Sequence, residues 1–173
     1  LVTTLHGVSP LVAGYVVAVA SIAWTVAAVL VSGAHARHDP KFIAIGMATV
    51  TLSVLGFAWS VPHGPVWLIA VSAALEGGGF GMAWTFILRR ATALAPASET
   101  ERIAAAMPTV QRLGYALGAA YAGIVANAAG FSGTADRETL SHVATTIFLA
   151  CLPLAALGLL AAARFVRREY RAV

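Results

Sequence analysis

The chain has 173 residues, of which 60% are hydrophobic and 10% are charged, and its mean hydropathy is +0.84. A soluble domain usually carries about 25% charged residues, so this chain has too few polar groups for a water-exposed surface, and lipid is its expected solvent. The net charge of +4 does not indicate nucleic-acid binding, because the charges fall in short gaps between apolar runs.

Cysteine and histidine usage excludes two further classes. The single cysteine, Cys151, lies in an apolar run, so an internal disulfide framework is impossible. The histidines at 6, 35, 38, 63 and 142 are not spaced like a metal site, and we expect no metal and no cofactor. The chain begins at Leu1 without a signal-peptide pattern, so we expect a fragment of a longer protein.

Apolar runs predict an all-α transmembrane helix bundle. A bilayer core of about 30 Å needs about 20 helical residues for each crossing, and five runs are long enough. We predict one domain over residues 1–173 with spans at about 10–32, 42–61, 65–88, 103–129 and 145–166. Ser9 followed by Pro10 is typical of a helix start. The stretch 131–142 is expected to be the longest loop, with room for a short amphipathic turn.

Basic residues concentrate on one side of this predicted bundle. Nine of the eleven lysine and arginine residues lie in the connections 33–41 and 89–102 and in the tail from 164 onward. Since cytoplasmic loops carry an excess of lysine and arginine, this predicts that the N-terminus of the chain lies outside and the C-terminus in the cytoplasm. Five spans give this alternation, whereas four or six would break it.

Glu76 lies at the midpoint of the span 65–88 and is the only acidic residue in any predicted span. A charge at the bilayer centre costs at least about 2.5–3.5 kcal/mol on insertion scales, so such residues face water-filled cavities or find partners. One interpretation is a carboxyl that carries a proton or binds a cation along a transport pathway. The alternative is a protonated, hydrogen-bonded packing residue.

The span 103–129 carries further polar side chains. Arg112 lies about nine residues, or about 13 Å, into it. Its side chain could reach the cytoplasmic surface and have a structural or gating role, or it could pair with Glu76 or bind an anionic substrate. Gln111 and Tyr115 are further candidates for cavity or gating residues.

The glycine run and the tryptophan residues each allow more than one interpretation of their role. The run from Gly77 to Gly81 is weak as a phosphate loop, because no Lys-Ser or Lys-Thr follows it. Its spacing of four favours close helix packing or a flexible gating helix, and Gly114 and Gly118 share that spacing. Trp24 and Trp84 could line a cavity or fill the core, whereas Trp59 and Trp67 are placed like interfacial anchors.

Three stretches of the chain resemble the C-terminal half of a major facilitator superfamily transporter, in its drug:proton antiporter branch. They are Gly7–Gly14, glycine-rich Leu75–Trp84, and the most specific, Pro108–Ala120, which reads Pro-Thr-Val-Gln-Arg-Leu-Gly-Tyr-Ala-Leu-Gly-Ala-Ala. The resemblance implies that the five spans correspond to core helices eight to twelve. It also implies that the first, third and fourth spans border a central cavity and that the second and fifth, which lack charged residues, are peripheral.

One loop departs from the family pattern. That pattern has a glycine, an Asp-Arg pair, a second glycine and basic residues. In the loop 33–41, Gly33 fits, but Arg37 replaces the aspartate and Pro40 replaces the second glycine. This weakens any role of the loop in locking the conformational switch. Glu76 matches no family-wide position, so its role rests on physical reasoning alone.

These observations predict a secondary active transporter of a small molecule, coupled to protons and exporting by alternating access, present as a C-terminal fragment. Its expected partners are the lipid bilayer, a small-molecule substrate and the missing N-terminal half, with no nucleic acid. The expected location is the bacterial inner membrane. The alternative is a non-transporting membrane scaffold or assembly subunit. An enzyme is not expected, because no histidine or aspartate that could form a catalytic pair lies in a span.

Overall fold

The computed structural model describes residues 1–132 and 136–167. In these residues the chain forms six α-helices and two short 3-10 helices. In chain order the elements are α1 (Val2–His6), α2 (Pro10–Val31), η1 (Ala36–His38), α3 (Asp39–His63), α4 (Val66–Ala93), η2 (Ala97–Glu99), α5 (Thr100–Ala128) and α6 (Arg137–Val166). The predicted all-helical fold is confirmed. Arg168 and Arg171, which contributed to the predicted charge asymmetry, lie outside the described residues.

Local signals in the sequence account for where two of the long helices begin. At α2, the Ser9 hydroxyl accepts a hydrogen bond from the Val12 N–H at 3.3 Å, and Pro10 opens the first turn. At α6, Asp136 Oδ1 accepts a bond from the Thr139 N–H at 2.8 Å. Hydrogen bonds from Thr139 lower the pKa of the Asp136 carboxyl below its usual range.

The expected loop 131–142 was wrong over its second half. Residues 137–142 belong to α6, which begins eight residues before the predicted span at Thr145. The Asp136 cap is the physical reason, because it satisfies a backbone donor of the first turn and lets the helix start ahead of the apolar run. A search for apolar residues does not detect such a polar first turn.

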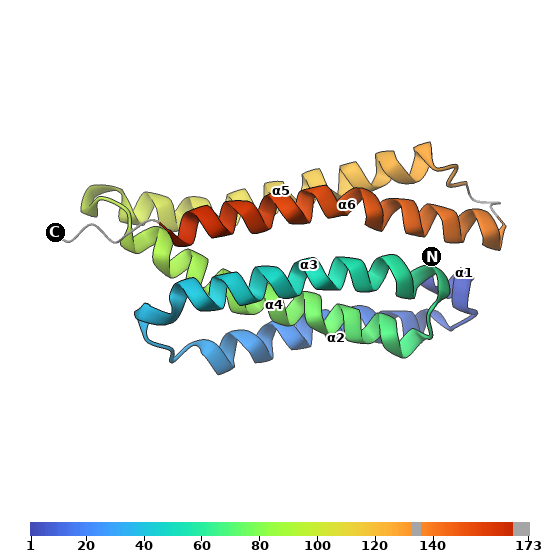
Figure 1. The fold of residues 1–173 in the computed structure, drawn as a ribbon, viewed down its shortest axis with the longest axis horizontal. Coiled ribbons are helices and arrows are strands. Elements are labelled where there is room, and N and C mark those ends of the chain that lie inside the picture. Colours follow the sequence, from blue (N-terminus) through green and yellow to red (C-terminus); the bar gives the residue numbers. More distant parts are fainter. Residues whose placement is uncertain (133–135, 168–173) are drawn as a thin grey trace.

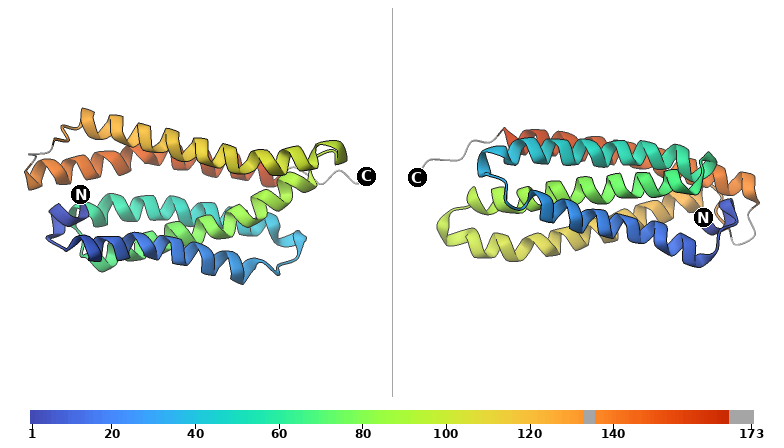
Figure 2. Two further views of the ribbon diagram at one scale, coloured as in Figure 1. Left: turned by 180° about the vertical axis from the view of Figure 1, so that it is seen from behind. Right: turned by 90° about the horizontal axis from the view of Figure 1, so that it is seen from below.

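The long helices run antiparallel along a flat, elongated bundle (Figures 1 and 2). α4 packs along both α2 and α3, and α3 packs along α6. Seen from below, in the right-hand view of Figure 2, α3 and α6 lie on one side and α2 and α5 on the other. α5 runs beside α6 but makes few contacts with α4 or α6, so one long helix is loosely held in this bundle.

The helix ends divide the bundle into two different ends. The end of α2, the start of α3, the end of α4, the start of α5 and the end of α6 meet at one end, which we call the arginine-rich end (left in Figure 1). It carries these described basic residues: Arg37, Lys41, Arg89, Arg90, Arg102, Arg164 and Arg167. The chain's N-terminus lies at the other end, called here the opposite end.

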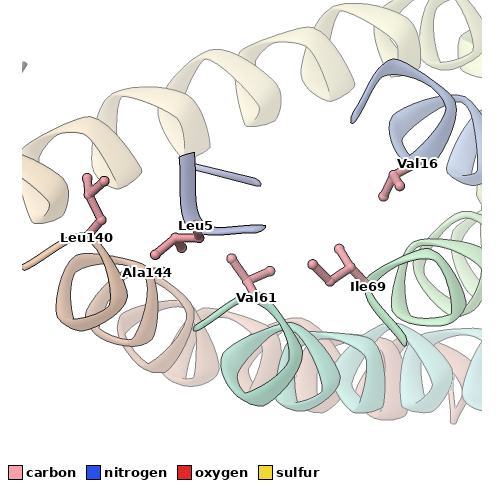
Figure 3. Packing of buried hydrophobic residues seen from close by; sticks show 6 residues of the cluster. All are labelled: Leu5, Val16, Val61, Ile69, Leu140 and Ala144. Carbon is pink, nitrogen blue, oxygen red and sulfur yellow. The ribbon is translucent and has the colours of Figure 1, made fainter. Parts of the chain in front are cut away.

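Small apolar clusters lie toward each end. At the arginine-rich end, Ile43, Phe86 and Ala162 join α3, α4 and α6. At the opposite end the cluster brings together five helices (Figure 3), through Leu5, Val16, Val61, Ile69, Leu140 and Ala144. Leu5 of α1 lies between Val61 and Ala144 (Figure 3), which fixes the short first helix against the bundle.

A histidine holds α1 to the end of α3. The carbonyl of Val61 would normally accept from the N–H four residues later, but that residue is Pro65, which has no N–H. The His6 ring Nε2, 2.8 Å from the Val61 oxygen, takes its place as donor. A buried carbonyl is thereby satisfied by the segment that precedes α2.

Within the described residues, four helices are long and apolar enough to cross a membrane: α2, α3 together with η1, α4 and α6. α5 has the length, with 29 residues, but Arg112, Gln111 and Asn127 lower its apolar content. The chain is thus an integral membrane protein, and the fifth crossing remains a prediction. Large apolar side chains such as Leu30, Trp67 and Leu117 stand exposed, as expected of surfaces that meet lipid or further helices.

Candidate functional site

The middle of α4 presents a stripe of candidate side chains. Glu76, Phe80 and Trp84 follow one another at intervals of four residues and so share one side of the helix. Glu76 is exposed, in the middle of a helix that is long and apolar enough to span a membrane. Among the described residues it has no ion-pair or hydrogen-bond partner. A carboxyl placed this way can exchange a proton or meet a cation.

Aromatic rings form a continuous stack next to this carboxyl. Trp24 of α2 stacks on Phe80 with ring centroids 5.0 Å apart, and Phe80 stacks on Trp84 with centroids 6.3 Å apart. All three side chains are partly exposed. Trp24 and Trp84 are therefore brought together through Phe80, a residue that was not among the predicted candidates. The stack offers flat apolar faces one turn from a carboxyl.

On its two packed sides, α4 meets its neighbours backbone to backbone. A Cβ added at Gly77 would overlap the backbone of Ala20 and lie 2.9 Å from its Cα, and one at Gly81 would lie 2.9 Å from the Cα of Trp24. Toward α3, a Cβ on Gly79 would stand 2.7 Å from the carbonyl oxygen of Gly46. Real Cβ atoms are not found at such distances, so glycine is required at these crossings.

The candidates on α5 lie apart from this stripe. Gln111 Nε2 donates to the Tyr115 hydroxyl at 2.9 Å, one turn along the helix. Arg112 is exposed, and within the described residues it forms no ion pair with Glu76. A Cβ added at Gly114 or Gly118 would meet no described atom within 4 Å. In this structure these two glycines therefore face open space and not a packed helix.

An ion pair closes the arginine-rich end. Asp39 is fully buried, and both of its oxygens accept from the Arg89 guanidinium, with Nε to Oδ2 at 3.2 Å and Nη2 to Oδ1. Arg89 Nη1 also donates to the carbonyl of Ala34 at 2.9 Å, and its guanidinium stands 4.8 Å from the centre of the Phe86 ring. The loop before α3 is thus fastened to the end of α4.

Sequence reasoning missed this pair. It compared the loop 33–41 with the family pattern and found Arg37 where an acid was expected, whereas Asp39, two residues on, supplies the charge. A signal was present, because the positive-inside pattern had already put Asp39 and Arg89 on the same side of the membrane. No feature of the sequence indicated which arginine would meet the aspartate.

The comparisons with known proteins agree with this architecture. The family model described as Major Facilitator Superfamily matches residues 1–173, the whole chain. The chain belongs to the Major Facilitator Superfamily. It is therefore a transporter-family membrane protein and not an enzyme.

Curated relatives within the superfamily come from two strains of Mycobacterium tuberculosis, CDC 1551 / Oshkosh and H37Rv. Each is named a probable multidrug-efflux transporter and is 30% identical to this chain over 176 aligned residues. The alignment covers 96% of the chain but 35% of each relative, so the chain spans about a third of their length. No solved structure gives a significant match to the chain.

Proposed function

We propose that the chain forms part of a proton-coupled exporter of small amphipathic molecules, in which Glu76 carries the proton. Family membership and the names of the relatives support the transport and export parts of this proposal. The observation that carries the coupling part is an exposed carboxyl in the middle of the central helix α4, beside the stacked rings of Trp24, Phe80 and Trp84.

The mechanism depends on the surroundings of the Glu76 carboxyl in each of two conformations of the transporter. A proton shifts the balance between two conformations only if Glu76 binds it with different affinity in each. Facing water, the carboxyl is readily charged; enclosed by apolar surface, it favours the neutral form. Substrate held against the rings would compete with or displace that proton. Gln111, Arg112 and Tyr115 of α5 are proposed to line the same pathway or to gate it.

The second wall of such a pathway would come from outside this chain. Transporters of this kind enclose a midplane site between two repeats that rock against each other. We propose that an N-terminal half supplies the missing wall. We also propose that the arginine-rich end faces the cytoplasm of a bacterial cell, as the positive-inside rule predicts.

Transport by the full-length protein in sealed vesicles tests this proposal. With a fluorescent multidrug substrate and an imposed pH gradient, Glu76→Gln should lower gradient-driven uptake at least roughly tenfold, because the amide cannot exchange a proton. Substrate exchange without a gradient should persist. Glu101→Gln, which changes an exposed carboxyl at the start of α5, serves as the matched control and should behave as the wild type.

Two results would contradict the proposal in different ways. Gradient-driven transport that Glu76→Gln leaves unchanged would remove this residue from coupling. A wild-type protein that reaches the membrane but moves no substrate under any gradient would favour the alternative of a non-transporting scaffold.

A further inference from the structure

An apolar groove lies between four helices at the arginine-rich end. It has a volume of about 350 Å³ and is lined by Met47 of α3, Ile87 of α4, Met107 of α5, and Gly158, Ala161 and Phe165 of α6, among other apolar residues. It opens where α5 stands away from its neighbours, since α5 makes few contacts with α4 and α6. The groove is distinct from the stripe of Glu76, Phe80 and Trp84.

The side chains of the described residues leave this groove unfilled. Its α6 wall consists of small residues up to Phe165, and the nearest neighbour of Gly158 is the flexible end of Met47, 3.3 Å from where a Cβ would stand. Water is a poor occupant, because the lining offers almost no polar partner. In a membrane protein the apolar molecule at hand is a lipid, so an acyl chain is the natural occupant.

Three arginines lie at the end of the bundle where the groove opens. Arg90 is buried beside the groove residue Phe165, with its guanidinium 6.0 Å from the centre of that ring, and it donates to the Val166 carbonyl at 3.1 Å. Arg164 and Arg167 are exposed and lie within two residues of Phe165 at the end of α6.

Most acidic side chains described at this end already form ion pairs with arginines. Asp39 is bonded to Arg89, and Glu99 lies 2.8 Å from Arg102. Glu101 is exposed in the first turn of α5. The exposed charge described at the end of α6 is therefore positive, and it complements a phosphate.

We propose that this groove binds one acyl chain of an anionic phospholipid, whose phosphate lies against Arg164 and Arg167. The apolar walls take up the chain, and the two arginines select for a net negative headgroup. Each basic residue near an anionic lipid surface contributes on the order of fivefold in affinity, so the preference for an anionic over a zwitterionic lipid should be measurable. This site does not depend on proton coupling at Glu76.

Native mass spectrometry of the purified full-length protein tests the site, with phosphatidylglycerol and phosphatidylcholine that carry identical acyl chains. The wild type should retain its most tightly bound phosphatidylglycerol at least roughly fivefold more strongly than phosphatidylcholine. Ala161→Phe, which fills the groove, should weaken retention of both lipids. Ala156→Phe adds the same ring to an exposed position of α6 that does not line the groove, and it should behave as the wild type.

A second pair of variants tests the headgroup without changing the groove. The double change Arg164→Gln and Arg167→Gln should remove the preference for phosphatidylglycerol while acyl-chain retention persists. Arg137→Gln, which removes one charge at the opposite end, should leave the preference for phosphatidylglycerol unchanged. Equal retention of both lipids by the wild type would overturn the proposal. So would wild-type retention by Ala161→Phe, or an undiminished preference in the double variant.

Discussion

At the scale of single residues, the pair of Asp39 and Arg89 has the most direct consequence for stability. The Asp39 side chain is 0% exposed, whereas that of Arg89 keeps 35% of its surface. A buried carboxylate is tolerated only when its lone pairs are used, and here the guanidinium uses them. The half-exposed arginine can return to water if its partner is lost, but the buried carboxylate cannot.

The first prediction concerns Asp39→Asn. It should lower the free energy of unfolding by roughly 1–3 kcal/mol, below the roughly 3–5 kcal/mol that is typical when both partners are buried. Glu99→Gln, at the exposed pair with Arg102, should change it by less than about 1 kcal/mol. Denaturant unfolding of the purified protein measures both, and equal effects would show that burial of Asp39 is irrelevant.

Side-chain partners of this kind are hard to predict from sequence because they depend on how helices are rotated. Asp39 and Arg89 are 50 residues apart, and Arg89 has an equally charged neighbour in Arg90. The helix that carries each residue was predictable, but the direction in which each side chain points was not. Arg90 instead turns toward α6 and meets Phe165 and Val166.

At the scale of elements, two successive glycines on α4 have different surroundings. Gly77 faces the backbone of α2, whereas a Cβ at the next residue, Gly78, would meet nothing within 4 Å among the described residues. Gly77→Ala should therefore force α2 and α4 apart and lower the free energy of unfolding by about 1–3 kcal/mol.

Gly78→Ala is the matched control for that change, because it adds the same methyl group one residue away. It should be neutral, or stabilising by up to about 1 kcal/mol, since alanine favours the helix. Thermal unfolding of both variants in the same detergent gives the comparison. A Gly77→Ala protein as stable as Gly78→Ala would mean that α2 and α4 do not approach this closely.

The start of α6 gives a prediction about pH. The pKa of Asp136 is lowered by its hydrogen bonds with Thr139, so the cap stabilises the folded helix above the carboxyl's unfolded pKa and is lost as pH falls through the folded one. The protection of the Thr139 and Leu140 amides against hydrogen exchange, relative to the intrinsic exchange rate at the same pH, should therefore fall below about pH 4. Asp136→Asn should keep the cap and lose this pH dependence; persistent dependence would assign it to another group.

How well each helix could be predicted depended on which residues define it. Apolar runs located both ends of α2 and the start of α4 to within one residue, since lipid exposure demands continuous apolar surface. They missed the last turn of α4, which continues past the predicted end at residue 88 to Ala93. The first turn of α6 escaped because a polar cap defines it. The stripe on α4 was half predicted: Glu76 and Trp84 stood out as a charge and a tryptophan in a span, but Phe80 resembles any core residue until its stacking with Trp24 is seen.

At the scale of the whole molecule, the fifth crossing needs a direct test, because α5 is the long helix whose composition is least apolar. Arg102 lies before most of α5 and Arg137 lies after it, and both are exposed. If α5 spans the bilayer, a cysteine at each position should react with a membrane-impermeant reagent from opposite sides of a sealed vesicle. Cys151→Ser provides the background.

A third site completes that labelling experiment. Arg164→Cys, in the last turn of α6, should react from the same side as Arg102→Cys. Reaction of Arg102→Cys and Arg137→Cys from one side would place α5 on the membrane surface and reverse the proposed orientation of part of the chain.

The glycine crossings of α4 restrict how this part of the protein can move. Where two helices touch through their main chains, no side chain lies between them to change rotamer and absorb a small displacement. α4 is held in this way by α2 on one side and by α3 on the other, so the three helices respond as one rigid unit. If Glu76 carries the proton as proposed, its loading should displace these three helices together, and we expect α5, with its sparse contacts, to be the helix that shifts relative to them.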